Sequence, residues 1–152
     1  MEPILPGKWI AMLNRATQMH VNNHLAKDGV GAGQYPFLLF IGRCGGCSQD
    51  EIAKKLCFDK GTTARALKKL EIAGLITRTV SESDHRRHEV SLTKEGKRMR
   101  LRARKLLEVW HNHLLEGVPD HSRKELVETL EKMAQKAIFS VKDINLKEQS
   151  EE

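Results

Sequence analysis

Long apolar segments are missing from this sequence of 152 residues. No stretch approaches the roughly 20 apolar residues that a helix needs to cross a bilayer, so we expect no membrane partner. No apolar secretory segment is present, and the three cysteines are an odd number, which together favour a reducing cytoplasm. A nucleophile–base–orienter set and a glycine-rich phosphate loop are also lacking. We therefore predict a protein that is not an enzyme and carries no cofactor.

Positive charge is concentrated in one part of the chain. The sequence pI is about 9.3 and the formal net charge is +6. Residues 60–105 alone hold 14 Lys and Arg against 5 Asp and Glu, a net charge of +9. Such clustering favours a polyanionic partner. Apolar residues make up only 39% of the chain, which predicts a thin core and a protein partner that covers the remaining apolar surface.

Apolar periodicity, capping residues and glycines predict a mainly α fold with one β-hairpin. The expected elements are helices over 8–27, 35–44, 49–56 and 60–73, strands over 75–80 and 88–92, and helices over 93–115 and from 122 onward. Four helix starts carry capping signals, namely the S-x-x-E boxes that begin at Ser48 and Ser122 and the single residues Asp59 and Thr93. The tail after Asp143 is polar and is expected to fray.

The central elements place a short helix, a turn, a second helix and a basic hairpin in succession, which is typical of a winged helix-turn-helix that reads duplex DNA. We expect three parts: an N-terminal dimerisation helix (1–34), a winged helix-turn-helix lobe (35–96) and C-terminal dimerisation helices (97–152). The dimer is predicted because the flanking helices carry more apolar surface than a monomer buries: Trp9, Met12, Trp110, Leu114, Leu126, Leu130 and Met133.

Three segments resemble the MarR family of prokaryotic transcription regulators. They are SQDEIAKKL (48–56), DKGTTARALKKLEIAGLI (59–76) and SDHRRHEVSLTKEG (83–96), the last with the D-x-R signature at the tip of the wing. The resemblance implies a homodimer with interdigitated terminal helices that binds a palindromic double-stranded DNA operator. It also implies release by a small anionic or aromatic effector, and a cytoplasmic protein that joins the nucleoid when bound.

Residues near the start of a recognition helix reach base edges in the major groove. Lys60, Thr62, Thr63 and Arg65 occupy this position, and Arg65 is suited to bidentate contact with guanine. The spacing of Thr63 to Leu67 and Leu70 fits a core position equally well. Lys68 and Lys69 are expected to meet phosphates.

At the tip of the hairpin, Arg86 is expected to enter the minor groove, with Asp84 orienting it and Arg87 on a phosphate. The alternative is an ordinary solvated loop. The basic run over 94–105 fits either an approach to the phosphate backbone or a solvated helix face.

Cys44 and Cys47 form a C-x-x-C pair, whose alternatives are a redox switch, half of a metal site, or a buried cysteine beside one in a loop. A full structural zinc site needs a second pair, and only Cys57 remains. A thiol oxidoreductase would require a βαβ context that is not present. The preferred interpretation therefore has no metal.

The histidines leave a similar choice. His20 and His24 are four residues apart on one helix, a spacing that can hold a metal. Together with His111 they are the candidates for the effector site. The leading hypothesis is a dimeric repressor released by an effector, and the second is a redox- or metal-responsive regulator of the same fold.

Overall fold

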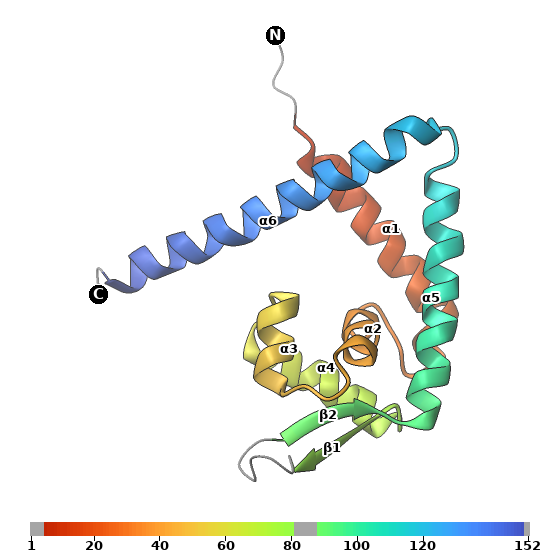
Figure 1. The fold of residues 1–152 in the computed structure, drawn as a ribbon, viewed down its shortest axis with the longest axis vertical. Helices are drawn as coiled ribbons and strands as arrows, with labels where there is room; N and C mark the ends of the chain where they lie inside the picture. Colours follow the sequence, from red (N-terminus) through yellow and green to blue (C-terminus); the bar gives the residue numbers. More distant parts are fainter. Residues whose placement is uncertain (1–4, 81–87, 151–152) are drawn as a thin grey trace. The chain divides into compact units, whose positions relative to one another are not determined.

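The computed structural model describes residues 5–80 and 88–150, of which 142–150 by their backbone alone. Its elements are α1 (Gly7–Leu25), the 3₁₀ turn η1 (Ala26–Asp28), α2 (Tyr35–Cys44), α3 (Gln49–Leu56), α4 (Lys60–Ile72), β1 (Ile76–Val80), β2 (His88–Leu92), α5 (Lys94–Leu114) and α6 (Asp120–Ser150) (Figure 1). The two strands pair antiparallel, with Ile76 opposite Leu92. The predicted fold class, mainly α with a small antiparallel sheet, is confirmed.

The chain forms two compact units, Met1–Trp110 and His111–Glu152. The sequence-based division assigned functional roles to 1–34, 35–96 and 97–152. It does not describe compact units, so it stays a prediction. Within the described residues, no helix combines the length and the apolar character that a bilayer span requires.

The first unit has one hydrophobic core, to which α1 to α5 and both strands contribute. Its largest fully buried side chains are Phe37, Leu25, Leu38, Ile41, Ile52, Leu67, Leu70, Leu75, Val21, Val30 and Val90. The end of α1 and the first half of α5 therefore pack in the same core as the helix-turn-helix. Displacing either helix would disturb the packing of α3 and α4, because protein cores are close-packed.

Three of the predicted helix caps are present. Ser48 accepts a hydrogen bond from the Glu51 nitrogen at 3.2 Å, and the Glu51 carboxylate accepts one from the Ser48 nitrogen at 2.9 Å. Asp59 caps α4, and the Thr93 hydroxyl accepts a hydrogen bond from the Gly96 nitrogen at 2.9 Å. These caps set the first residues of α3, α4 and α5.

The expected start and end of the last helix are wrong. α6 begins at Asp120, two residues before the expected cap, and it runs to Ser150 instead of fraying after Asp143. The Ser122 nitrogen donates to the Pro119 carbonyl at 2.9 Å, and Arg123 pairs with Asp120 at 3.1 Å. These interactions within the first turn place Ser122 inside the helix, where it cannot act as a cap.

The two ends of the hairpin are joined at its base. The Thr93 nitrogen donates to the Leu75 carbonyl at 3.0 Å, and the Thr93 hydroxyl donates to the Gly74 carbonyl at 2.7 Å. A Cβ at Gly96 would overlap the Leu75 carbonyl oxygen, so the start of α5 sits directly on the backbone that precedes β1. The end of α4, the hairpin and the start of α5 are thereby held together.

The α2–α3 connection joins the hairpin through one isolated β-bridge. Val90 donates to the Cys47 carbonyl at 2.8 Å, and the Cys47 nitrogen donates to the Val90 carbonyl at 3.4 Å. Cys47, expected in a loop, is thus buried against β2. Cys44, at the end of α2, is half-buried and is joined to Cys47 by a disulfide.

Candidate nucleic-acid interface

Helix α4 has one buried and one exposed face. Thr63, Ala66, Leu67 and Leu70 are buried in the core. Lys60, Arg65, Lys68 and Lys69 are exposed, and Thr62 is partly exposed. The helical period therefore sorts the predicted DNA-contacting residues onto one surface, with a single exception.

That exception is Thr63, which corrects the sequence-based prediction. Its side chain is fully buried, and its hydroxyl donates to the Asp59 carbonyl at 2.9 Å. The alternative core position, indicated by its spacing to Leu67, is the one observed. Thr63 supports the first turn of α4 and does not present its side chain to a groove.

A chain of hydrogen bonds runs along the first turn of α4. Arg65 Nη2 donates to the Thr62 hydroxyl at 3.1 Å, and this hydroxyl donates to Asp59 Oδ2 at 2.6 Å. The hydrogen bond from the Thr62 side chain, followed by that from its backbone, lowers the pKa of Asp59 below its ordinary value. The anionic cap thus orients Thr62, and Thr62 orients the Arg65 guanidinium at the exposed helix start.

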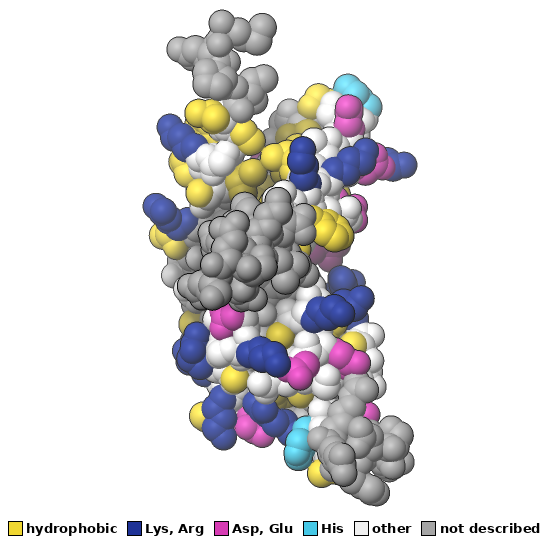
Figure 2. All heavy atoms as spheres, turned by 90° about the vertical axis from the view of Figure 1, so that its left-hand side faces the viewer, with side chains coloured by type: hydrophobic (Ala, Val, Ile, Leu, Met, Phe, Trp, Pro, Cys, Tyr) yellow, Lys and Arg dark blue, Asp and Glu magenta, His cyan; other side chains and the backbone are white. Residues whose placement is uncertain are grey.

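Two other cations of α4 lie near carboxylates. Lys60 is 3.5 Å from Asp50, and Lys68 is 3.4 Å from Glu71. The Lys60–Asp50 pair is solvent-exposed and therefore weak, so a phosphate can replace this carboxylate at little cost, whereas Glu71 is half-buried and also lies near Arg78. Figure 2 shows the same pattern across the lower part of its face, where Lys and Arg side chains alternate with Asp and Glu.

The wing tip cannot be compared with its prediction, because Asp84, Arg86 and Arg87 lie outside the described residues. The strands that lead to the tip are described. Val80 and His88 are the last pair of the hairpin before the tip and are both exposed. The roles of the three tip residues stay predictions.

Arg78 of β1 is a positioning residue that the sequence analysis missed. Its Nη1 donates to Gln49 Oε1 of α3 at 2.9 Å, and its Nε lies 3.6 Å from Glu71 of α4. Arg78 therefore connects the hairpin to both helices of the helix-turn-helix. Its only sequence signal was a basic residue in a strand, because its partners are distant along the chain.

Three arginines of the basic run over 94–105 make contacts within the protein. Arg98 pairs with Glu95, and Arg102 Nη1 lies 2.6 Å from Asp28. Arg100 Nε donates to the Leu39 carbonyl at 3.3 Å. These three arginines stabilise α5 and its contacts with earlier elements. Arg98 and Arg102 still face solvent, as do Lys94, Lys97, Arg104 and Lys105.

The structure brings together two of the three candidate effector residues. The His20 and His24 rings lie 4.4 Å apart, and His20 stacks on Trp110 at 4.5 Å. Burial lowers the pKa of His20, and the neighbouring His24 lowers it further. His111 is exposed and belongs to the second compact unit.

His24 also borders a cavity of about 280 Å³ between α1 and α5, which is lined by His24, Leu25, Arg102, Lys105, Leu106 and Val109. Its walls are mostly hydrocarbon, with two cations at the side of α5. Among residues 5–80 and 88–141, whose side chains are described, no group of three or more His, Cys, Asp or Glu residues is placed to hold a metal ion.

Comparison with known proteins identifies the family. A family model described as the MarR family matches residues 32–88. The transcriptional regulator BilQ of Clostridium symbiosum is 32% identical over 111 residues, which cover 73% of this chain and 77% of that protein.

Solved structures support the same family assignment. A MarR transcriptional regulator from Methanosarcina mazei is 35% identical with a TM-score of 0.79, over 87% of this chain and 95% of that one. A MarR-family regulator from Listeria monocytogenes, crystallised with 26mer DNA, is 23% identical with a TM-score of 0.82 over 92% of each chain, and shares the fold. These relatives are transcription regulators and not enzymes, which excludes the thiol oxidoreductase alternative. The protein with the capped recognition helix α4 and the hairpin β1–β2 therefore belongs to the MarR family of transcription regulators.

Proposed function

We propose that this regulator binds a palindromic DNA operator as a homodimer, with α4 in the major groove and the tip of the hairpin in the adjacent minor groove. The main support for this proposal is the exposed start of α4, where Thr62 and Asp59 orient the Arg65 guanidinium. Arginine in this position can bind the O6 and N7 atoms of guanine together. The Listeria protein of the same fold was crystallised with 26mer DNA, which supports DNA as the ligand of this fold.

The dimer is proposed from the apolar surface of α1. Trp9, Met12 and Leu13 are 61%, 52% and 49% exposed. Large apolar side chains clustered on one helix favour burial against a partner. In α6, Leu126, Val127 and Leu130 are exposed as well, so each compact unit carries a surface of this kind.

The effector is proposed to be a small anionic or aromatic compound whose binding releases the operator, so that the protein acts as a repressor in a prokaryotic cytoplasm. The cavity beside His24 supports this, because its hydrocarbon walls suit an aromatic ring and Lys105 attracts an anion, while Arg102 already pairs with Asp28.

The experiment that tests the function is the recovery of genomic DNA bound to the protein, followed by titration of the purified protein with the enriched fragment. We expect a palindrome with half-sites about one helical turn apart. DNA recovered without an enriched sequence, or binding equally strong to scrambled duplex, would contradict an operator-binding function.

Sedimentation velocity tests the dimer separately. Leu13→Glu places a charge in the apolar surface of α1 and should shift the protein toward the monomer mass. Gln18→Glu adds the same charge at an exposed polar position of the same helix and should leave the dimer intact. A monomeric wild-type protein would refute the proposed assembly.

A further inference from the structure

The Cys44–Cys47 pair lies where three elements of the DNA-binding lobe meet. Cys44 is the last residue of α2, and the Cα atoms of the two cysteines are 6.0 Å apart. Cys47 is hydrogen-bonded on both sides to Val90 of β2, and the next residue, Ser48, caps α3. A bond between the two sulfurs therefore ties the end of α2 to the wing sheet and to the start of the helix-turn-helix.

Two glycines allow the short connection between the cysteines. Gly45 and Gly46 have φ angles of +61° and +106°, a backbone region that residues with a side chain rarely adopt. Glycine is also the most flexible residue in a chain that is not restrained. When the disulfide is reduced, the Gly45–Gly46 connection is therefore expected to gain a large amount of conformational entropy.

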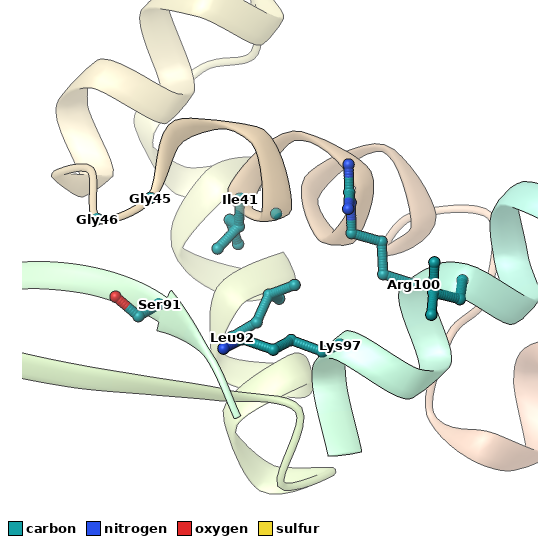
Figure 3. Close-up of a pocket in the computed structure, with 9 residues that line it drawn as sticks. Ile41, Gly45, Gly46, Ser91, Leu92, Lys97 and Arg100 are labelled. Carbon is teal, nitrogen blue, oxygen red and sulfur yellow. The ribbon is translucent and has the colours of Figure 1, made fainter. Parts of the chain in front are cut away.

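Solvent reaches one cysteine of the pair, because Cys44 is half-buried, and a cavity borders the connection between the two cysteines. Gly45 and Gly46 line a cavity of about 460 Å³ that is bordered by α2, β2 and α5 (Figure 3). In Figure 3 the Arg100 side chain runs from α5 toward α2, and Lys97 extends beneath Leu92. Cys44 is the more exposed of the two cysteines, since Cys47 is only 5% exposed.

We propose that Cys44 and Cys47 form a reversible dithiol–disulfide pair that hydrogen peroxide oxidises and a low-molecular-weight dithiol reduces. The Cys44 thiolate attacks one peroxide oxygen, the O–O bond breaks, and the hydroxide that leaves takes a proton to give water. The resulting Cys44 sulfenic acid is attacked by the Cys47 sulfur, which forms the S–S bond and releases a second water. In total, two thiols and one peroxide give one disulfide and two waters.

Oxidation strengthens DNA binding, and this consequence rests on the proposed function. The disulfide holds the α2–α3 connection, the Cys47–Val90 bridge and the cap of α3 in the arrangement described above. The dithiol form must order this connection when it binds, which costs conformational entropy. The oxidised protein is expected to bind the operator at least about threefold more tightly than the reduced protein, with little change in structure elsewhere.

The test uses the full-length protein with Cys57→Ser, so that the pair holds the remaining thiols; Cys57 is exposed and unpaired in the structure. The reduced protein is treated with one equivalent of peroxide. Free thiols, peptide masses, amide exchange at Val90 and affinity for the enriched DNA fragment are then measured. We expect loss of both thiols, a Cys44–Cys47 crosslinked peptide, slower exchange at Val90 and tighter binding, all reversed by dithiothreitol.

The matched control adds Cys47→Ser to the same background, which leaves Cys44 to be oxidised without a partner. It should form no crosslink, and its exchange and affinity should stay at the reduced values. Thiols that survive peroxide, or a crosslinked protein with the exchange and affinity of the reduced form, would overturn the proposal. If neither form binds DNA, the proposed function fails, while the thiol count and the exchange at Val90 still decide whether the pair restrains the lobe.

Discussion

Asp59 holds Thr62 at two points, through the backbone nitrogen at 2.7 Å and through the hydroxyl at 2.6 Å. The carboxylate therefore caps α4 and also sets the side chain on which Arg65 rests. The stability of α4 depends on this carboxylate, and under the proposed function so does the recognition of DNA by Arg65.

The first prediction follows from this double role. Asp59→Ala should lower both the melting temperature and the operator affinity, since the cap and the orientation of Arg65 are lost together. Asp59→Asn keeps the backbone cap and should retain more of the stability than of the affinity. Thermal unfolding and fluorescence anisotropy measure the two losses, and an Asp59→Asn protein that binds the operator as tightly as wild type would contradict a role for the anionic oxygen.

The contribution of Asp59 to the stability of the fold should depend on pH in one direction. Because the pKa of Asp59 is lowered in the folded protein, its contribution to stability is present above its unfolded value of about 3.9 and is lost as the pH falls through the lower folded value. The stability difference between wild type and Asp59→Asn should therefore shrink below about pH 4.

A second prediction distinguishes the buried Thr63 of α4 from the exposed Arg65 of the same helix. Arg65→Ala should weaken operator binding by about tenfold and relax the preference at one base pair. Thr63→Val should leave operator affinity within about twofold, and should cost about 1 kcal/mol of stability for the lost hydrogen bond to Asp59. A large loss of affinity in a folded Thr63→Val protein would show that this residue faces the DNA after all.

The third prediction concerns the wing. Arg86→Ala should weaken operator binding by about tenfold or more, because a guanidinium senses the negative potential of a narrow minor groove. Arg87→Ala should instead weaken binding to all sequences alike and reduce the slope of log affinity against log salt by about 1. If the Arg86→Ala protein binds the operator as tightly as wild type at fixed salt, the tip of the wing does not contact the DNA.

A fourth prediction tests the base of the hairpin. Gly96→Ala should destabilise the protein by about 1–3 kcal/mol, although alanine is the better helix former, because the added methyl overlaps the Leu75 carbonyl oxygen. Gly33→Ala is the control, since a Cβ there meets no atom within 4 Å, and its effect should stay within about 0.5 kcal/mol. Urea unfolding compares them, and similar midpoints for the two variants would argue against the close packing of α5 on Leu75.

The fifth prediction uses His20, whose pKa is lowered by burial and by His24. The unfolded chain takes up this proton more readily, so the contribution of His20 to stability is present above the ordinary value of 6.5 and is lost as the pH falls below it. The melting temperature of wild type should fall more than that of His20→Gln between about pH 7.5 and pH 5.5. His111→Gln, at an exposed position, should follow wild type, and an unchanged slope in His20→Gln would contradict the assignment.

Sequence reasoning succeeded where the determining interactions are local. The caps at Ser48, Asp59 and Thr93 lie within four residues of their partners, so they were visible in the sequence. Ser122 offered the same local signal, but the Asp120–Arg123 ion pair and the Pro119 carbonyl favour a start two residues earlier.

Contacts between residues that are distant along the chain could not be predicted from the sequence. Neither the contact of Arg78 with Gln49 nor the bridge between Cys47 and Val90 follows from periodicity or spacing. Thr63 was ambiguous for a different reason, because the first turn of a recognition helix carries both core and groove positions one residue apart. Burial in the folded lobe decided between them.

The hydrogen bonds of Thr93 to Gly74 and Leu75 close the chain on itself at the base of the hairpin. The polypeptide thus enters and leaves the hairpin at one point, and the helices on either side are held independently of the residues beyond it. Substitutions farther along the hairpin are therefore expected to leave the junction between the end of α4 and the start of α5 intact.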